Sequence, residues 1–190
     1  DVLERHPRRA ALHPLRSIPT PDTDLTGAWF AVAGDPLVDP LVERIVGDLG
    51  GQRVALADAD RVAYHAAACI ASNHLVALLG QVERVAATAG VPLDAYLDLV
   101  RGTVDNVERL GPAAALTGPV ARGDHATVAR HLNALAAAER PAYEALSDAA
   151  RTLCAVGSGR APGGAGVEGQ AGQGRVLRQI QQLSLARGSA

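Results

Sequence analysis

The sequence contains no lysine and no methionine, although it is 190 residues long and carries 18 basic side chains, all of them arginine. Without lysine there can be neither a Walker-A phosphate loop nor Schiff-base catalysis. Aromatic residues make up only 3% of the chain, which argues against stacking surfaces for single-stranded nucleic acid. The net charge of -2 and the pI near 6.3 exclude binding of nucleic acid or membranes through bulk positive charge.

Cysteine is also scarce, since Cys69 and Cys154 are the only two. Two cysteines are too few for a disulfide-stabilised secreted domain and favour a reducing compartment, so we expect a cytoplasmic protein. The first residues are charged and do not resemble a signal peptide. Because the chain begins at Asp1 rather than methionine, we expect further residues upstream of it.

One stretch, residues 62–82, contains no charged side chain and is long enough to cross a bilayer. Six polar side chains interrupt it, and each would need a partner in hydrocarbon; they are Tyr64, His65, Ser72, Asn73, His74 and Gln81. The composition therefore favours a helix buried in protein, with no membrane as partner.

The pattern of apolar residues and turn residues along the chain predicts a mainly α protein with a small α/β part at its N-terminus. Residues 1–58 alternate short apolar runs with turns, and a helical segment between two of the runs ends at Gly50–Gly51, which predicts a strand–helix–strand unit at the edge of a parallel sheet. Four apolar residues recur along that helix, namely Leu37, Leu41, Ile45 and Leu49. Residues 59–155 read as helices throughout, and residues 156–190 as a Gly-rich flexible tail.

Within the helical part, stop signals at residues 90–92 and 111–112 divide the pattern into helices over about 60–90 and 93–110. A loop follows over residues 115–119. Asp124 is expected to cap the next helix. Pro141 opens a last helix that reaches Cys154.

The first long helix carries a polar stripe. At 100° per residue, His65, Cys69, Ser72 and Asn73 fall within about 100° of one another. Buried polar groups need partners, so the stripe faces another helix, water or a ligand. Structural packing is the first explanation. A metal site is disfavoured because His74 points away from His65 and no second ligand cluster exists; a Cys69–His65 nucleophilic pair lacks an acidic residue to orient it.

Two further groups of residues are candidates for binding. His13 and Pro14 end the first apolar run, and ligands of open α/β sheets bind beyond the carboxyl ends of strands. Arg16 lies close by and suits an anion. Arg122, near Thr117, is a second candidate for an anion. The alternative for each group is an ordinary turn.

Three motifs in order carry a resemblance: residues 11–17 (ALHPLRS), residues 64–68 (YHAAA) with 71–73 (ASN), and residues 115–119 (ALTGP) with 122–124 (RGD). The chain resembles a largely uncharacterised family of short-subunit dehydrogenase-like oxidoreductases, which join a Rossmann domain to a helical C-terminal domain of unknown function. The helical part is similar to the C-terminal domain of 6-phosphogluconate dehydrogenase. The resemblance implies the last strands of a Rossmann-type sheet, NAD(P)-linked chemistry and a homodimer formed through the long helix.

The resemblance also implies roles for residues, and the chain departs from the pattern in two places. The Gly-rich loop that binds pyrophosphate is absent, so we expect NADP or NAD to be bound tightly only by a longer protein. Related dehydrogenases carry a lysine where this chain has Cys69, so His65 is nominated as the proton donor. The implied set has no metal and comprises catalytic His65 and Asn73, substrate-binding Ser72, Thr117, Arg122 and Arg16, and cofactor-binding His13 and Pro14.

Two functions follow. The first is the C-terminal part of an NAD(P)-dependent oxidoreductase for a small carbonyl, imine or hydroxy-acid substrate, with His65 as general acid/base. The second is a non-catalytic helical module for dimerisation or ligand binding that does not bind the cofactor. Neither involves nucleic acid.

Overall fold

The structure, a computed structural model, describes residues 5–6 and 8–158. The chain divides after Val100 into two compact units, and each is described by itself. The predicted Gly-rich tail lies outside the described residues from residue 159 onward.

The first unit contains a three-stranded sheet in the order β1-β2-β3. Strand β1 runs antiparallel to β2, whereas β3 is parallel to β2. The parallel pair is joined through a 3-10 turn and helix α1, which confirms the predicted strand–helix–strand unit. The bounds are β1 Ala10–Pro14, β2 Trp29–Gly34, η1 Pro36–Val38, α1 Asp39–Asp48 and β3 Gln52–Ala55.

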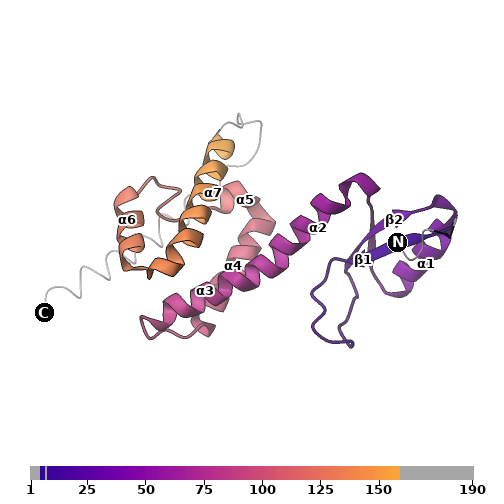
Figure 1. Cartoon of the computed structure of the whole chain (residues 1–190), viewed down its shortest axis with the longest axis horizontal. Coiled ribbons are helices and arrows are strands. Elements are labelled where there is room, and N and C mark those ends of the chain that lie inside the picture. The colour runs from indigo at the N-terminus through magenta and orange to yellow at the C-terminus, as the bar shows by residue number, and fades with distance from the viewer. Residues whose placement is uncertain (1–4, 7, 159–190) are drawn as a thin grey trace, which may run out of the picture. The chain divides into compact units, whose positions relative to one another are not determined.

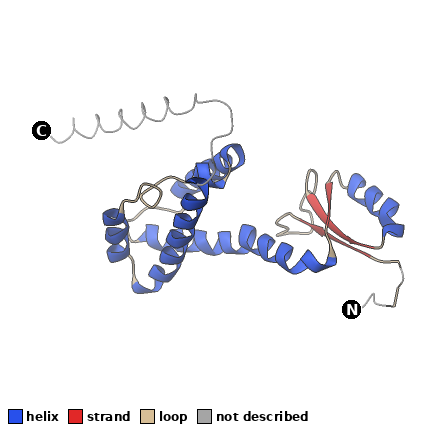
Figure 2. Cartoon of the chain, turned by 90° about the horizontal axis from the view of Figure 1, so that it is seen from above, coloured by secondary structure: helices blue, strands red, loops and turns tan. Residues whose placement is uncertain are grey.

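Helix α1 covers one face of this sheet (Figures 1 and 2). The core between them consists of Ala28, Phe30, Val32, Val42 and Val46. The apolar stripe that indicated α1 in the sequence is not the face that packs on the sheet. All four residues of the stripe are exposed, namely Leu37, Leu41, Ile45 and Leu49. The helix therefore carries two apolar faces, of which only one is buried in this chain.

One long helix follows the sheet in four segments: η2 Asp58–Asp60, α2 Arg61–Cys69, the π-helix η3 Ile70–His74 and α3 Leu75–Ala87. It ends before Gly90, whose φ of 69° takes the left-handed conformation, as the stop signal predicted. Residues 58–87 are long and apolar enough to cross a membrane by length and composition. The expectation that this stretch is buried in protein is wrong for this chain, since none of the apolar window is buried.

Helix α4, Asp94–Leu110, includes the point of division between the units. The second unit continues with α5 Pro112–Ala115, α6 His125–Ala134, η4 Ala137–Glu139 and α7 Arg140–Ser158. Helix α5 lies between the stop signal at residues 111–112 and the predicted loop at residues 115–119, where the sequence predicted no element, and it packs against α7. Asp124 caps α6 as predicted, because its Oδ1 accepts a hydrogen bond of 2.9 Å from the Thr127 amide. The chain is thus mainly helical with a small N-terminal sheet.

Candidate functional site

A cavity of about 230 Å³ lies in the first unit, against the face of the sheet that α1 does not cover. The face follows from the register: Ala11 pairs with Ala33 and His13 with Ala31, and alternate residues of a strand point to opposite faces. Three alanines therefore form a flat apolar floor, from which the imidazole of His13 rises. The remaining lining residues come from the chain after β3 and from α2: Leu56, Arg61, Tyr64 and His65.

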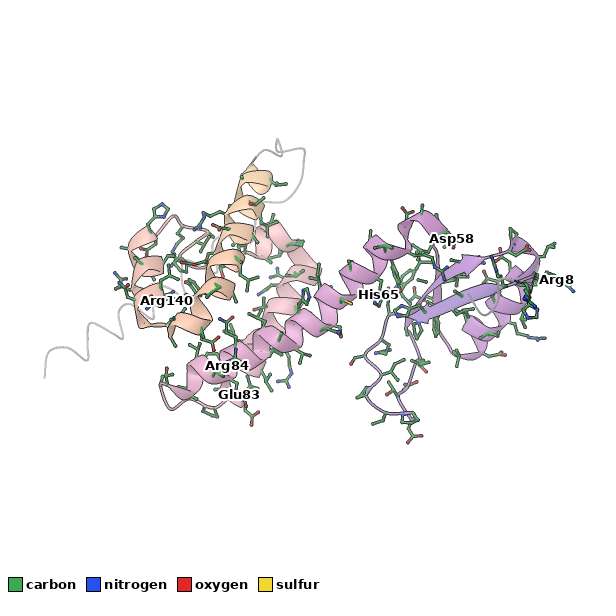
Figure 3. The ribbon with its side chains drawn as sticks, viewed as in Figure 1. Arg8, Asp58, His65, Glu83, Arg84 and Arg140 are labelled. Carbon is green, nitrogen blue, oxygen red and sulfur yellow. The ribbon has the colours of Figure 1, made fainter. Side chains whose placement is uncertain are left out.

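The polar side chains of the cavity contact one another. The Nδ1 atom of His13 lies 2.6 Å from the hydroxyl of Tyr64, and the two rings are perpendicular with centroids 5.5 Å apart. The ring of His65 meets the ring of His13 edge to face, with centroids 6.0 Å apart. On its other side, the Nε2 atom of His65 lies 3.6 Å from Sγ of Cys69. Two imidazoles and a phenol thus share one cavity, and Figure 3 labels His65 on α2.

Burial keeps the hydroxyl of Tyr64 protonated. Burial raises the pKa of Tyr64 above its ordinary value of 10.0, because a phenolate is less well solvated there than in water. Tyr64 is therefore a hydrogen-bond donor or acceptor at neutral pH. Arg61 adds a permanent positive charge, and its Nη1 lies 3.4 Å from Oδ1 of Asp58 in an exposed pair. These groups can bind an anion and exchange a proton with it.

The structure places two of the predicted site residues, His13 and His65, together in this cavity. Pro14 directly follows His13 and ends β1. The reason given for His13 was wrong, however: β1 is antiparallel, so its carboxyl end lies beside the amino end of β2. His13 reaches the cavity because it points to the face opposite α1.

The other predicted residues of the first unit do not line the cavity. Ser72 and Asn73 lie in the π-helix and are exposed. In a π-helix the hydrogen bonds run from residue i to i+5, which widens the turn, so the polar stripe drawn at 100° per residue does not continue in line from Cys69 to Asn73. Arg16 donates a hydrogen bond of 2.8 Å to the carbonyl oxygen of Thr26.

The remaining two predicted residues, Thr117 and Arg122, belong to the second unit and do not line the cavity either. The amide of Arg122 donates a hydrogen bond of 3.3 Å to the carbonyl of Gly118. Its positive charge also contributes to lowering the pKa of Asp124, after the larger effect of hydrogen bonds from Thr127.

Sequence reasoning missed two lining residues, Arg61 and Tyr64. A signal for Arg61 was present, because Arg61, His65 and Cys69 follow one another at intervals of four residues and so share a helix face. Tyr64 stands within a quoted motif, but its role depends on His13, 51 residues away. No local pattern reveals such a contact.

A dinucleotide would be sought at a strand-to-helix turn, and the described residues contain two of them. The turn from β3 into η2 and α2 carries the acidic residues Asp58 and Asp60. The turn from β2 into α1 reads Gly34–Asp35–Pro36, and the Asp35 carboxylate itself accepts a hydrogen bond of 2.8 Å from the Leu37 amide. Asp39 adds a second acidic group in the first turn of α1. The Asp35 carboxylate already accepts from an amide at the start of the helical segment, and Asp39 is paired with Arg53 at 2.9 Å, so this turn offers a pyrophosphate neither free amides nor a free cation and does not fit NADP. Among residues 5–6 and 8–158, no group of three or more His, Cys, Asp or Glu side chains is placed to hold a metal ion.

Comparison with known families decides the membership of the chain. Residues 28–150 match the family model described as domain of unknown function DUF2520. The chain belongs to the DUF2520 family. No curated protein matches this DUF2520 chain.

Two solved structures are similar to it. The first is BF3122 from Bacteroides fragilis, a candidate NADP oxidoreductase by its name, with a TM-score of 0.69, 23% identity and coverage of 80% of this chain and 60% of that one. The second is protein TM1727 from Thermotoga maritima, with a TM-score of 0.68, 27% identity and coverage of 79% of this chain and 63% of that one. The fold of the DUF2520 chain is therefore similar to that of BF3122 and TM1727, and the chain aligns with less than two thirds of either of these proteins.

Proposed function

We propose that this DUF2520 chain is the C-terminal, substrate-binding part of an NAD(P)-dependent oxidoreductase that acts on a small carbonyl, imine or hydroxy acid. The observation that carries the proposal is the cavity in which His13, Tyr64 and His65 meet above an alanine floor. A small apolar pocket with a few converging polar groups, two of which are imidazoles, suits proton exchange with a bound substrate.

In this proposal His65 is the general acid/base. Its ring lines the cavity, and Cys69 at 3.6 Å from Nε2 holds the ring in orientation. A proton on the His65 imidazole is available to a substrate oxygen or nitrogen in the cavity. His13 and Pro14 are proposed to face the cofactor. The catalytic role of Asn73 and the substrate-binding roles of Ser72, Arg16, Thr117 and Arg122 rest on the family resemblance alone.

We place the dinucleotide outside the described residues, because the β2–α1 turn does not fit a pyrophosphate. Two features of the first unit support this placement. In the described part of the chain β1 pairs with β2 alone and forms an edge of the sheet, where a further strand can add. Beside it lies a groove of about 410 Å³ whose lining combines apolar residues such as Leu12, Leu41 and Ile45 with His6, Arg8 and Arg9. Both BF3122 and TM1727 are longer than this chain, and the name of BF3122 includes NADP.

We also propose that the long helix packs against a second copy of the chain. Three of its apolar side chains, Val62, Ile70 and Val76, are between 59% and 82% exposed in the single chain. Exposed apolar surface of this kind marks an interaction site. Sedimentation of the wild type and of Val76→Arg tests this: the variant should be a monomer, and a monomeric wild type would contradict the proposal. The proposal also places the protein in the cytoplasm, with a small molecule as its substrate and with neither nucleic acid nor a membrane as its partner.

The second candidate function is a helical dimerisation or ligand-binding module without redox activity. The acidic β2–α1 turn and the exposed apolar helix both favour it, because neither requires a cofactor.

Titration of NADPH and NADH separates the two functions. We would measure nucleotide fluorescence with the 190-residue chain and with the protein extended by the residues that precede it in its reading frame. Enhancement with the longer protein only supports the oxidoreductase. Enhancement with neither protein supports the module, and tight binding by the 190-residue chain contradicts the placement of the nucleotide outside it.

A further inference from the structure

We infer that Arg61 and Tyr64 form a subsite for a short carbonyl compound that also carries a carboxylate, such as a 2-oxo acid. The Arg61 guanidinium binds the carboxylate, and the Tyr64 hydroxyl donates a hydrogen bond to the carbonyl oxygen. The catalytic role of this subsite rests on the proposed function, but the inference assigns two residues to substrate binding that the family resemblance does not name.

The position of both side chains on α2 supports the pairing. Arg61 and Tyr64 are three residues apart, which places them next to each other on one side of a helix, and both line the cavity. A ligand held by the two therefore lies over the alanine floor, beside His13 and His65. A carbonyl oxygen at Tyr64 lies within the same cavity as the imidazole that we propose as general acid/base.

The contact with His13 prepares the Tyr64 hydroxyl to donate. Hydrogen positions are set by the tautomer of His13: with the proton on Nδ1, the imidazole donates across the 2.6 Å contact and the phenol oxygen accepts. The phenolic hydrogen is then free to point to a ligand. Burial keeps that hydrogen in place, because it raises the pKa of Tyr64. A donor fixed before the substrate arrives stabilises negative charge that develops on the carbonyl oxygen.

Arg61 is held only loosely in the structure as described. Its guanidinium pairs with the carboxylate of Asp58, three residues earlier, at 3.4 Å, and both side chains are at least half exposed. Pairs of this kind contribute little to stability, so a carboxylate that enters the cavity can replace Asp58. A guanidinium can also grip a carboxylate with two parallel hydrogen bonds.

The size of the cavity restricts the ligand. A volume of about 230 Å³ is below the usual range for drug-sized ligands. The floor of Ala11, Ala31 and Ala33 offers no polar group to the rest of the ligand, so a short alkyl chain fits there. These features together favour a carboxylate, an adjacent carbonyl and a small apolar tail.

The second unit contains a matched control pair. The Nδ1 atom of His131 lies 2.7 Å from the Tyr143 hydroxyl, with perpendicular rings whose centroids are 5.9 Å apart. The geometry is close to that of His13 and Tyr64, but neither His131 nor Tyr143 lines either cavity described above. A ligand that recognises the subsite rather than any His–Tyr pair will leave Tyr143 unaffected.

The test is a titration of the 190-residue chain, labelled with 13C at the hydroxyl-bearing carbon of tyrosine, with pyruvate. The chain has three tyrosines, so Tyr64→Phe and Tyr143→Phe assign the resonances. We expect a saturable shift of the Tyr64 resonance and none of Tyr143. Arg61→Gln should weaken the binding by about 10- to 100-fold, as loss of a hydrogen bond between charged groups does. No saturable shift of Tyr64, equal shifts of both resonances, or unchanged affinity of Arg61→Gln would each overturn the inference.

Kinetics with the longer protein distinguishes this inference from the proposed function. Arg61→Gln should raise KM for pyruvate but not for butanone, which lacks the carboxylate, and Tyr64→Phe should lower kcat more than it changes KM. Binding of pyruvate through Arg61, with no oxidation of NADPH or NADH by pyruvate or by a panel of other small oxo acids, ketones and imines, would overturn the proposed function and leave the subsite. Turnover of pyruvate with the wild-type KM in Arg61→Gln would overturn the subsite and leave the function.

Discussion

Replacing Val46 by alanine should destabilise the first unit far more than replacing Leu37, although leucine loses the larger side-chain volume. Val46 is 3% exposed in the core between α1 and the sheet, whereas Leu37, a member of the stripe that indicated the helix, is 75% exposed. Leu37 lies in η1, directly before α1, so the comparison tests which apolar side chains of the η1–α1 segment pack on the sheet.

The expected magnitudes follow from burial. Val46→Ala removes two buried carbons at roughly 0.8 kcal/mol each and leaves a small cavity, so the cost is about 2 kcal/mol. Leu37→Ala removes three carbons, but about three quarters of the residue already faces water, so the cost is roughly 0.6 kcal/mol. These are differences in the free energy of unfolding of the first unit.

The assay is unfolding in urea followed by tryptophan fluorescence. Trp29 is the single tryptophan of the chain and lies in β2, so its emission reports on the first unit. A midpoint that falls clearly for Val46→Ala and barely for Leu37→Ala is expected, with similar slopes. Equal losses in the two variants, or a larger loss for Leu37→Ala, would refute the assignment of the buried face.

Three further predictions concern other parts of the chain. Gly34→Ala should cost about 1–3 kcal/mol, measured in urea, because a Cβ there would lie 2.5 Å from the Cα atom of Ala10 and push β1 from β2. Asp124→Ala should lower the melting temperature at neutral pH. Hydrogen bonds from Thr127 lower the pKa of the Asp124 carboxyl below 3.8, so the difference in melting temperature between variant and wild type should shrink as the pH falls through that lowered value. A difference that stays constant with pH would contradict the cap. In an absorbance titration, Tyr64 should ionise above pH 10.0. The unfolded phenol loses its proton at a lower pH than the folded one, so the free energy of unfolding should fall as the pH rises from 10.0 through the raised pKa. Ionisation of Tyr64 at or below pH 10.0 would contradict its burial.

Local signals in the sequence predicted much of the fold. The strand–helix–strand unit, the end of the long helix before Gly90 and the cap at Asp124 each depend on residues close together in the chain. Apolar spacing and capping chemistry act over a few residues, so they can be read without knowledge of the rest of the structure.

The remaining features depend on contacts that no local pattern encodes. The antiparallel direction of β1 is set by its pairing with β2, about 20 residues later in the chain. The π-helix from Ile70 to His74 has no sequence signature that we recognised, and it changes the face on which Asn73 lies. The cavity combines His13 from a strand with Tyr64 from a helix. The sequence named His13 and His65 as separate candidates, and only the structure shows that they share a cavity; their roles stay predictions.

The central claim is that the cavity around His65 is where a substrate exchanges a proton. Its most direct test is the rate of NADPH oxidation by the longer protein, with a panel of small oxo acids, ketones and imines, in the wild type and in His65→Ala. The account predicts that kcat/KM falls by about 10²–10⁴-fold in the variant, as loss of a general acid/base does, while the melting temperature stays close to that of the wild type. An unchanged kcat/KM in a folded His65→Ala protein would contradict the account.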